Sequence, residues 1–289
     1  MTQHDGYTQL TEQGYAVIRG AVSTEACERA LADIAAFKRK HRGAIQGNVN
    51  EHDQLYRVVN LHLAIDALAS VFSDNQALPV CDRFFDQPAT LYTTLYYERG
   101  SEQALHRDTP YFCTRPADRY LGVWLALDDV DAGNGPLRVV PGSHRLPPID
   151  VAALARKLFP DPASIPSISD PGWNAYQAAV QQQCDERGMS HREVHVRRGD
   201  VIIWHPQMFH GGSPHLIRER SRRSLVMHVT PRGVPVHHID VFYNPDKALP
   251  TKAEWRYYRH GQRHIARFRQ IDFGHTHTMP VRRLRWPLF

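Results

Sequence analysis

The chain has 289 residues, of which 35 are Lys or Arg and 30 are Asp or Glu, for a formal net charge of +5. This length can bury a full hydrophobic core, and no stretch approaches the roughly 18 apolar residues that indicate a membrane span. The basic surplus favours an acidic substrate or a polyanion, whereas the absence of zinc-finger, RRM and KH signatures argues against nucleic acid as a partner.

The N-terminal part of the chain is predicted to hold two strands separated by three helices. A strand at residues 14–20 precedes a helix over residues 23–42, whose first residue, a serine, is a plausible N-cap. Further helices are predicted at residues 64–72 and 75–85. Residues 91–98 are rich in Thr and Tyr and are predicted to form the second strand.

The middle of the chain is predicted to be mostly β, with one interruption. Strands are predicted at residues 124–130 and 137–140. The interruption, at about residues 147–192, is Pro-rich and contains a short helix at residues 151–158 and a longer one near 175–187. Such an excursion between core strands is either a lid over the substrate or a surface elaboration, and both remain open.

Two further strands follow the insertion. Gly199-Asp200 marks a turn, and residues 201–204 (Val-Ile-Ile-Trp) form a buried strand pattern that leads into the loop holding His210. Residues 222–229 are predicted to form the next strand. We therefore expect a single mainly β domain over residues 1–289.

The C-terminal extension, at about residues 250–289, is basic. Within residues 252–270, aromatic and aliphatic side chains lie among arginines in a pattern that predicts an amphipathic helix with a basic face. Three roles are open for it. They are packing on the domain with solvated arginines, a site for an anionic group of the substrate, and contact with a membrane surface or nucleic acid.

Cysteine usage and the N-terminus bear on the cellular compartment. The cysteines are widely scattered, without CxxC or disulfide-framework spacing, so we expect reduced thiols. Residues 1–6 lack a basic stretch followed by an apolar run, so no signal peptide is expected. Both observations favour a cytoplasmic protein, and neither indicates an oligomeric state. The four cysteines are Cys27, Cys81, Cys113 and Cys184.

A His-x-Asp motif is the strongest chemical signal in the chain. Residues two apart on a β-strand point to the same side, so a strand would present His106 and Asp108 to one metal ion. With His210 as the third ligand, two imidazoles and one carboxylate suit Fe(II) and leave positions open for a cosubstrate and dioxygen. His205 and His215 are alternative third ligands, because they flank His210 in a chain with 18 histidines.

A cluster of arginines follows His210. A cosubstrate such as 2-oxoglutarate has a distal carboxylate, which Arg can hold with a permanent charge and bidentate hydrogen bonds. Arg222 stands at the beginning of a predicted strand and is the candidate for this contact. Three of the four arginines in the cluster are expected to form a solvated basic turn. The cluster consists of Arg218, Arg220, Arg222 and Arg223.

Short motifs between about residue 10 and about residue 230 match one family in order and spacing. They are residues 14–20 (Gly-Tyr-Ala-Val-Ile-Arg-Gly), His106-x-Asp108, Trp124 with Asp128-Asp129, Asn134-Gly135, residues 141–144 (Pro-Gly-Ser-His), Gly199-Asp200, His210-Gly211 and Arg222. Taken in order, these segments resemble the phytanoyl-CoA dioxygenase family of Fe(II)/2-oxoglutarate oxygenases. Each motif alone is weak, and their common order carries the resemblance.

The resemblance implies a mainly β fold with flanking helices, namely a double-stranded β-helix or jelly-roll related to the cupins. It implies Fe(II) on His106, Asp108 and His210. It also implies that Arg222 binds the distal carboxylate of 2-oxoglutarate. Trp124 matches an aromatic position beside the metal pocket of the family.

The chain departs from the family's pattern in ways that bear on function. Arg107 stands where Gln is frequent. The distal Arg follows the His by one residue more than is usual, so Ser221 occupies the nominal position and Arg223 competes with Arg222. Asp108 keeps the carboxylate that related halogenases replace by a small residue, which favours hydroxylation or another oxidation over halogenation.

Further contacts with the cosubstrate and the substrate are expected around the metal motif. Thr94, on the strand before this motif, is the candidate to donate a hydrogen bond to the distal carboxylate of 2-oxoglutarate, with Thr93 and Tyr96 as alternatives. Four residues in and after the motif are expected to face the substrate. They are Arg107, Thr109, Tyr111 and Phe112.

These observations predict an Fe(II)- and 2-oxoglutarate-dependent dioxygenase that hydroxylates an unactivated C–H bond of a small, anionic metabolite. One alternative is a non-haem iron enzyme that does not use 2-oxoglutarate. Another is a non-catalytic cupin-like binding protein. The sequence does not choose the substrate, nor does it choose among hydroxylation, desaturation, cyclisation and epimerisation.

Overall fold

The computed structural model describes residues 5–161, 165, 170–237 and 255–281. Within them the largest element is a ten-stranded sheet with the order β1-β8-β5-β10-β3-β2-β14-β15, to which β13 and β12 attach beside β3. Its strands are β1 (Tyr15–Ile18), β8 (Val201–Trp204), β5 (Leu121–Ala126), β10 (Ser224–Pro231), β3 (Ala89–Tyr97), β2 (Val58–Val59), β14 (Gln270–Phe273), β15 (His277–Pro280), β13 (Arg263–Ala266) and β12 (Tyr257–His260).

A smaller sheet with the order β7-β6-β9 faces the large one. Side chains from both sheets meet in one buried cluster, which includes Val139 from the small sheet and Trp124 from the large one. Two facing sheets of this kind form a double-stranded β-helix, as the motifs predicted. The shorter strands are β7 (Arg192–Val194), β6 (Leu137–Val139) and β9 (His210–Gly212), together with β4 (Cys113–Thr114) and β11 (Val236–His237), which pair with each other.

Strand β5 shows how the two faces of the large sheet divide the core. Trp124 and Ala126 belong to the cluster between the sheets, whereas Val123 and Leu125 belong to the cluster beneath the helices. Successive side chains of a strand point to opposite faces, and all six residues of β5 are buried. Because both faces are covered, the strand is a continuous apolar run.

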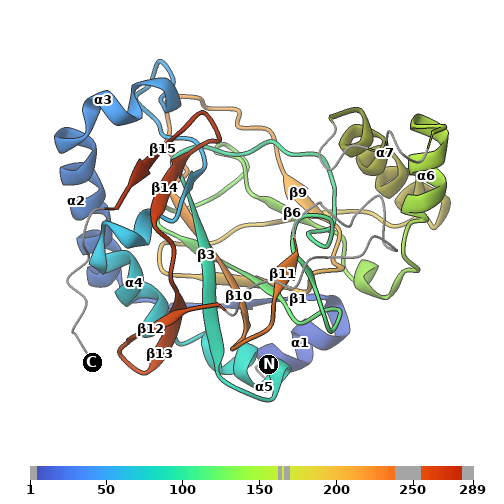
Figure 1. Ribbon diagram of the computed structural model, residues 1–289, viewed down its shortest axis with the longest axis horizontal. Coiled ribbons are helices and arrows are strands. Elements are labelled where there is room, and N and C mark those ends of the chain that lie inside the picture. Colours follow the sequence, from blue (N-terminus) through green and yellow to red (C-terminus); the bar gives the residue numbers. More distant parts are fainter. Residues whose placement is uncertain (1–4, 162–164, 166–169, 238–254, 282–289) are drawn as a thin grey trace.

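Helices cover the outer face of the large sheet, where Figure 1 shows α2 and α4 beside the strands. The predicted N-cap of α2 is confirmed, since Oγ of Ser23 accepts a hydrogen bond from the N–H of Ala26 at 3.2 Å. The helices of this side are α1 (Gly6–Gln13), α2 (Thr24–Lys40), α3 (Arg42–Ile45), α4 (Asp66–Ser73) and α5 (Leu78–Phe85), with the 3-10 turns η1 (Gln46–Asn48) and η2 (Leu61–Leu63).

The insertion lies on the opposite side of the molecule, where Figure 1 shows its two helices beside the small sheet. It forms α6 (Val151–Leu158) and α7 (Asp170–Glu186), after the 3-10 turn η3 (Ser143–Arg145). Tyr176 and Val180 of α7 are buried in one cluster with Phe209, the residue before His210. In the described part of the chain, no helix has both the length and the apolarity to cross a membrane.

The tail does not form the amphipathic helix predicted over residues 252–270. Where the structure describes this span, β12 and β13 form an antiparallel hairpin in which His260 pairs with Arg263. Gly261 sits in the turn between them with a φ of 55°, a left-handed conformation that interrupts a helix and suits a tight hairpin. Residues 252–254 of the predicted helix, and 282–289 of the extension, lie outside the described residues.

Close packing between β5 and β8 requires a glycine at position 122. Gly122 is the register partner of Trp204, and the indole lies directly over it. A Cβ added to Gly122 would be 2.1 Å from Cε2 of Trp204, far closer than two carbon atoms approach without bonding. Any side chain at this position must therefore displace the indole.

We expect Gly122→Ala to lower the free energy of unfolding by about 1–3 kcal/mol, because the added methyl group overpacks the core. Urea denaturation followed by circular dichroism measures this change. Gly43→Ala is the matched control, since an added Cβ at Gly43 in α3 meets no atom within 4 Å, and we expect a change of less than about 0.5 kcal/mol. Equal effects of the two substitutions would contradict the packing argument.

Candidate metal centre and its cavity

Three buried side chains converge between the two sheets. The ligand atoms of His106, Asp108 and His210 all lie within 4.8 Å of one another. Oδ1 of Asp108 is 3.6 Å from Nε2 of His210 and 3.9 Å from Nε2 of His106. These separations exceed hydrogen-bond distances and suit three donors arranged around one metal ion.

Backbone carbonyls orient both imidazoles. Nδ1 of His106 donates to the carbonyl oxygen of Ala104 at 2.8 Å, and Nδ1 of His210 donates to that of Met208 at 3.1 Å. Because a carbonyl can only accept, each Nδ1 carries the hydrogen and each Nε2 keeps a lone pair for a metal. Burial, together with the neighbouring His210, lowers the pKa of His106 to about 4, so its ring is neutral at pH 7.

The carboxylate of Asp108 is held by one of its two oxygens. Oδ2 accepts hydrogen bonds from Nε1 of Trp204 at 2.7 Å and from the hydroxyl of Tyr120 at 3.1 Å, so that Oδ1 faces the imidazoles. Burial alone would raise the pKa of Asp108, but His210, His106 and the indole N–H hold it below its usual range. The group is therefore ionised at neutral pH, and its donor set fits Fe(II).

A β-bridge, and not the predicted strand, brings the ligands together. His106 and His210 each donate a backbone N–H to the other's carbonyl, at 2.9 and 3.0 Å. The strand expected through residues 106–108 is wrong, because the N–H of Asp108 instead donates to the carbonyl of Pro206. His210 begins β9 and does not lie in the loop that was predicted to hold it.

A cavity of about 500 Å³ includes the three candidate ligands in its wall. Its volume lies within the range of roughly 300–1,000 Å³ that is usual for small-molecule sites. Strands β3, β5 and β10 of the large sheet, the segment after Asp108, helix α7 and the C-terminal tail all contribute to its lining. Its aromatic members include Tyr97, Tyr111, Phe112, Trp124, Trp173 and Phe268.

Arg222 lines this cavity and is buried. Its Nε donates to the carbonyl of Gly135 at 3.0 Å, and Nη1 donates to Oγ of Ser224 at 3.1 Å. The guanidinium carbon lies 4.9 Å from the centre of the Trp124 ring. Burial lowers the pKa of Arg222 to about 10, which leaves it charged at pH 7. Among the described residues no carboxylate pairs with it, so the site has an uncompensated cation.

Arg223, the competing arginine, faces away from the cavity and already has a partner. Its Nη2 lies 2.5 Å from Oδ1 of Asp128, and its Nε lies 2.9 Å from Oδ2 of the same carboxylate. These two adjacent residues, which directly precede β10, thus point to opposite sides. His205, the alternative metal ligand, packs against Phe84 and His144 and does not line the cavity.

Thr94 is placed on the side of β3 that faces away from the cavity. Its hydroxyl is 2.8 Å from Nδ1 of His62 in the buried outer layer. Thr93 lines the cavity instead, and its hydroxyl donates to Oδ1 of Asn60 at 2.6 Å. Tyr96 also faces the outer layer. This placement does not support the expected contact between Thr94 and the cosubstrate.

Of the four residues expected to face the substrate, the structure places two in the cavity wall, namely Tyr111 and Phe112. Arg107 lies elsewhere, with its guanidinium over the ring of Phe209 at 4.5 Å and Nη2 donating to the carbonyl of Leu146 at 3.1 Å. It thus anchors the start of the insertion. Thr109 is not among the residues that line the cavity.

Several lining residues carry no motif and were not predicted, and three of them come from separate segments of the chain. Arg57 comes from the loop before β2, Trp173 from the insertion and Phe268 from the C-terminal tail. The ring of Trp173 packs edge-on against His106, with 5.6 Å between the ring centres. Helix α7 therefore reaches the metal ligands, which favours the lid interpretation of the insertion over a surface elaboration.

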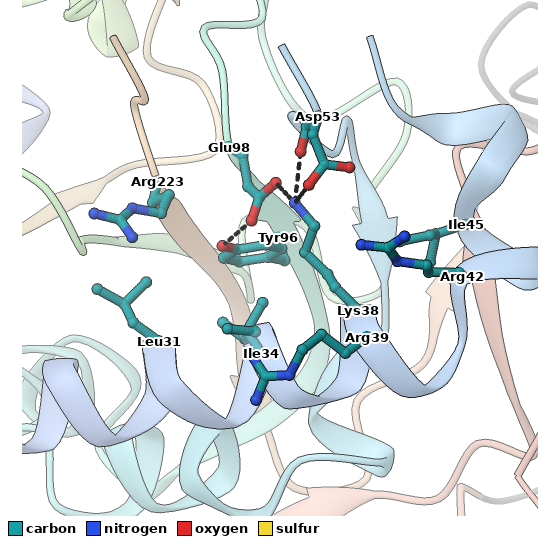
Figure 2. Close-up of a pocket in the computed structure, with 11 residues that line it drawn as sticks. Leu31, Ile34, Lys38, Arg39, Arg42, Ile45, Asp53, Tyr96, Glu98 and Arg223 are labelled. Carbon is teal, nitrogen blue, oxygen red and sulfur yellow. Dashed lines mark hydrogen bonds and ion pairs between the residues drawn. The ribbon is translucent and has the colours of Figure 1, made fainter. Parts of the chain in front are cut away.

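A second cavity, of about 300 Å³, lies between α2 and the outer side of β3, and Arg223 belongs to its lining (Figure 2). Nζ of Lys38 in α2 is 2.7 Å from Oε2 of Glu98 and 3.2 Å from Oδ2 of Asp53. The hydroxyl of Tyr96 donates to Oε1 of Glu98 at 3.0 Å. The carbonyl of Glu98 accepts a hydrogen bond from the backbone N–H of Arg222 at 2.8 Å. The network around Lys38 is therefore connected to the backbone of the arginine that lines the first cavity.

The sequence model of the family described as Phytanoyl-CoA dioxygenase (PhyH) matches residues 10–224. This chain belongs to that family. The match includes the three candidate ligands and Arg222, and it ends before the C-terminal tail.

Two curated relatives show how far the sequences of this family have diverged. Phytanoyl-CoA dioxygenase domain-containing protein 1 of Bos taurus is 26% identical over 200 residues, which cover 68% of this chain and 60% of that protein. The peroxisomal phytanoyl-CoA dioxygenase of Homo sapiens is 25% identical over 146 residues, which cover 50% of this chain and 37% of that protein. The chain thus spans less than two thirds of the length of these relatives.

Solved structures with the same fold include the non-heme alpha ketoglutarate dependent epimerase SnoN from nogalamycin biosynthesis. It superposes with a TM-score of 0.60 at 18% identity, covering 90% of this chain and 94% of SnoN. HygX from Streptomyces hygroscopicus, with nickel and 2-oxoglutarate bound, has a TM-score of 0.52 at 16% identity, covering 80% of this chain and 87% of HygX. These likenesses establish the fold.

We expect Trp204→Phe to weaken Fe(II) binding by roughly 10- to 100-fold, because Asp108 loses the shorter of the two hydrogen bonds that orient it. Anaerobic titration of Fe(II), with unfolding monitored in parallel, measures the effect. Tyr120→Phe removes the longer bond and should weaken binding less. Unchanged Fe(II) affinity in a folded Trp204→Phe protein would show that the indole does not orient the ligand.

Proposed function

We propose that this protein is an Fe(II)- and 2-oxoglutarate-dependent oxygenase that hydroxylates an unactivated C–H bond of a small, anionic metabolite. The observation that carries this proposal is the combination, in one cavity, of a two-His-one-carboxylate set with the buried Arg222. The ligand set suits Fe(II). A buried arginine without a carboxylate partner in the described structure suits the distal end of a dicarboxylate cosubstrate.

The side chains at the metal centre would divide into ligands and residues that orient the ligands. Nε2 of His106, Nε2 of His210 and Oδ1 of Asp108 would hold the iron, while Trp204 and Tyr120 keep the carboxylate turned toward it. When bound, iron with 2-oxoglutarate and dioxygen supplies the oxidising power for attack on a C–H bond. The protein's own contribution is to orient both organic molecules and to exclude water from the buried site.

Arg222 would bind the distal carboxylate of 2-oxoglutarate. Its guanidinium is fixed by Gly135 and Ser224 and lies near the ring of Trp124, so few rotamers remain to be lost when the anion binds. The packed indole also keeps water away from the ion pair that would form. Hydroxylation or another oxidation is favoured over halogenation, because Asp108 retains the carboxylate that related halogenases lack.

Anaerobic addition of Fe(II) and 2-oxoglutarate should produce a weak visible metal-to-ligand charge-transfer band. His210→Ala should abolish the band, since it removes one of the three donors, whereas His205→Ala should retain it. Optical absorption of the two variants, after confirmation that both are folded, measures the difference. No band in well-folded, iron-loaded wild-type protein would remove the 2-oxoglutarate assignment and favour another iron chemistry or a binding role.

Substitution of the two neighbouring arginines separates the cosubstrate contact from general charge. Arg222→Gln should raise the Kd for 2-oxoglutarate by roughly 10- to 100-fold, the value of hydrogen bonds to a charged group. Arg223→Gln removes the same charge but leaves Arg222 in place, so the Kd should stay within about twofold. Titration of the charge-transfer band gives both constants. A larger effect at Arg223 would assign the cosubstrate contact to that residue instead.

A further inference from the structure

Arg57 is a second cation in the active-site cavity, and the proposed chemistry does not use it. It lines the same cavity as Arg222 and the metal ligands. Its Nε is buried and has no hydrogen-bond partner, and in the described structure no acidic side chain pairs with its guanidinium. The side chain instead lies 5.7 Å from the ring centre of Tyr56. A buried guanidinium nitrogen without a partner can bind an acceptor that the protein itself does not supply.

The backbone at Arg57 is also unusual. Its φ is +47°, in the left-handed region that a non-glycine residue occupies at an energetic cost. The conformation is held by a neighbouring contact, because the carbonyl of Arg57 accepts the N–H of Gly274 from the C-terminal tail. The tail therefore fixes the segment that presents Arg57 to the cavity.

The formal charges of the proposed complex leave Arg57 unmatched. Fe(II) and Arg222 together carry three positive charges, while the carboxylate of Asp108 and the dianion of 2-oxoglutarate carry three negative charges. These groups cancel one another. Arg57 then remains as a half-buried positive charge in the cavity wall, where an opposite charge is favoured. Asp170 lines the same cavity and would bring this formal sum to zero, but it is exposed. No ion pair joins Asp170 to Arg57 among the described residues, so Arg57 has no direct partner, and Asp170 disfavours a second negative charge on the substrate.

Aromatic rings surround the remaining space. Tyr111 and Trp173 pack edge to face with 4.7 Å between their ring centres. The ring of Phe268 packs against those of Tyr92 and Trp255, with 5.7 and 5.4 Å between the ring centres. Two of these rings come from the insertion and the tail, which are the parts of the chain added around the jelly-roll. Flat apolar groups bind well among such rings.

The volume limits the size of the substrate. The cavity of about 500 Å³ must hold the cosubstrate as well as the substrate, so the space left within it suits a compact group. From the single unmatched cation and the aromatic wall, we infer that the substrate is a small carboxylic acid with a flat apolar ring, its carboxylate bound by Arg57 and its ring held among Tyr111, Trp173 and Phe268. This inference rests on the proposed oxygenase function and specifies its substrate class.

Binding of defined ring acids tests the inference. The probes are phenylacetate, cyclohexanecarboxylate and indole-3-carboxylate, each compared with its uncharged primary amide. Kd values come from quenching of tryptophan fluorescence, measured anaerobically in wild-type protein with and without Fe(II) and 2-oxoglutarate. We expect at least one acid to bind roughly tenfold or more tightly than its amide, because the amide cannot pair with the guanidinium.

Variants assign the preference to particular side chains. Arg57→Gln should abolish the difference between acid and amide, and Arg57→Lys should restore part of it, because Lys keeps the charge without the bidentate geometry. Arg39→Gln is the matched control, since Arg39 is exposed and lines the outer cavity drawn in Figure 2. Phe268→Leu should weaken acid and amide by the same factor, because it changes only the contact with the ring.

The outcomes separate this inference from the proposed function. Equal binding of acids and amides, or no binding of any probe to the wild type, would overturn the substrate class while the charge-transfer band remains. If Arg57→Gln instead weakens 2-oxoglutarate and leaves the preference for acids intact, Arg57 serves the cosubstrate and the inference is wrong. Absence of the band, with acids still bound through Arg57, would overturn the oxygenase proposal alone.

Discussion

The paired backbone hydrogen bonds between His106 and His210 are the constraint on which the rest of the site depends. They join two segments that are far apart in the sequence and place both imidazoles on one side of the bridge. Asp108 then needs only to be turned toward them, and Trp204 does this from the facing sheet. The metal centre thus depends on the register between the two segments. A shift of this pairing by one residue would turn one of the ligands to the opposite face.

Much of the fold follows from local sequence patterns. Three elements have patterns that depend only on neighbouring residues and can therefore be recognised in the sequence. They are α2 with its Ser23 cap and apolar spacing, β8 with its continuous apolar run, and β3 with its mixed pattern. Helix α1 was missed because its signals are weak, with one carboxylate cap at Asp5. The tail was misjudged because its aromatic and basic residues fit a helical face as well as they fit a hairpin until the left-handed turn at Gly261 is known.

The site residues that belong to a sequence motif could be predicted. Those that only the fold brings into the site could not. The two histidines, the aspartate and Arg222 belong to ordered motifs, and the structure gathers them in one cavity. The choice of Thr94 over Thr93 depended on strand parity, which composition does not reveal because both faces of β3 are buried. Arg57, Trp173 and Phe268 come from three unrelated segments, and only their meeting in space gives them a role.

The two sides of β3 and β10 carry different chemistry on adjacent residues. On the inner side is the cavity with Arg222. On the outer side, Lys38 of α2 is held by Glu98 (Figure 2). The backbone carbonyl of Glu98 accepts the N–H of Arg222. Glu98 therefore contacts both a surface helix and the backbone of a buried cation. Substitutions in the outer layer can consequently change the position of Arg222 and the affinity of the anion site. They can do so without altering any side chain that a bound molecule touches.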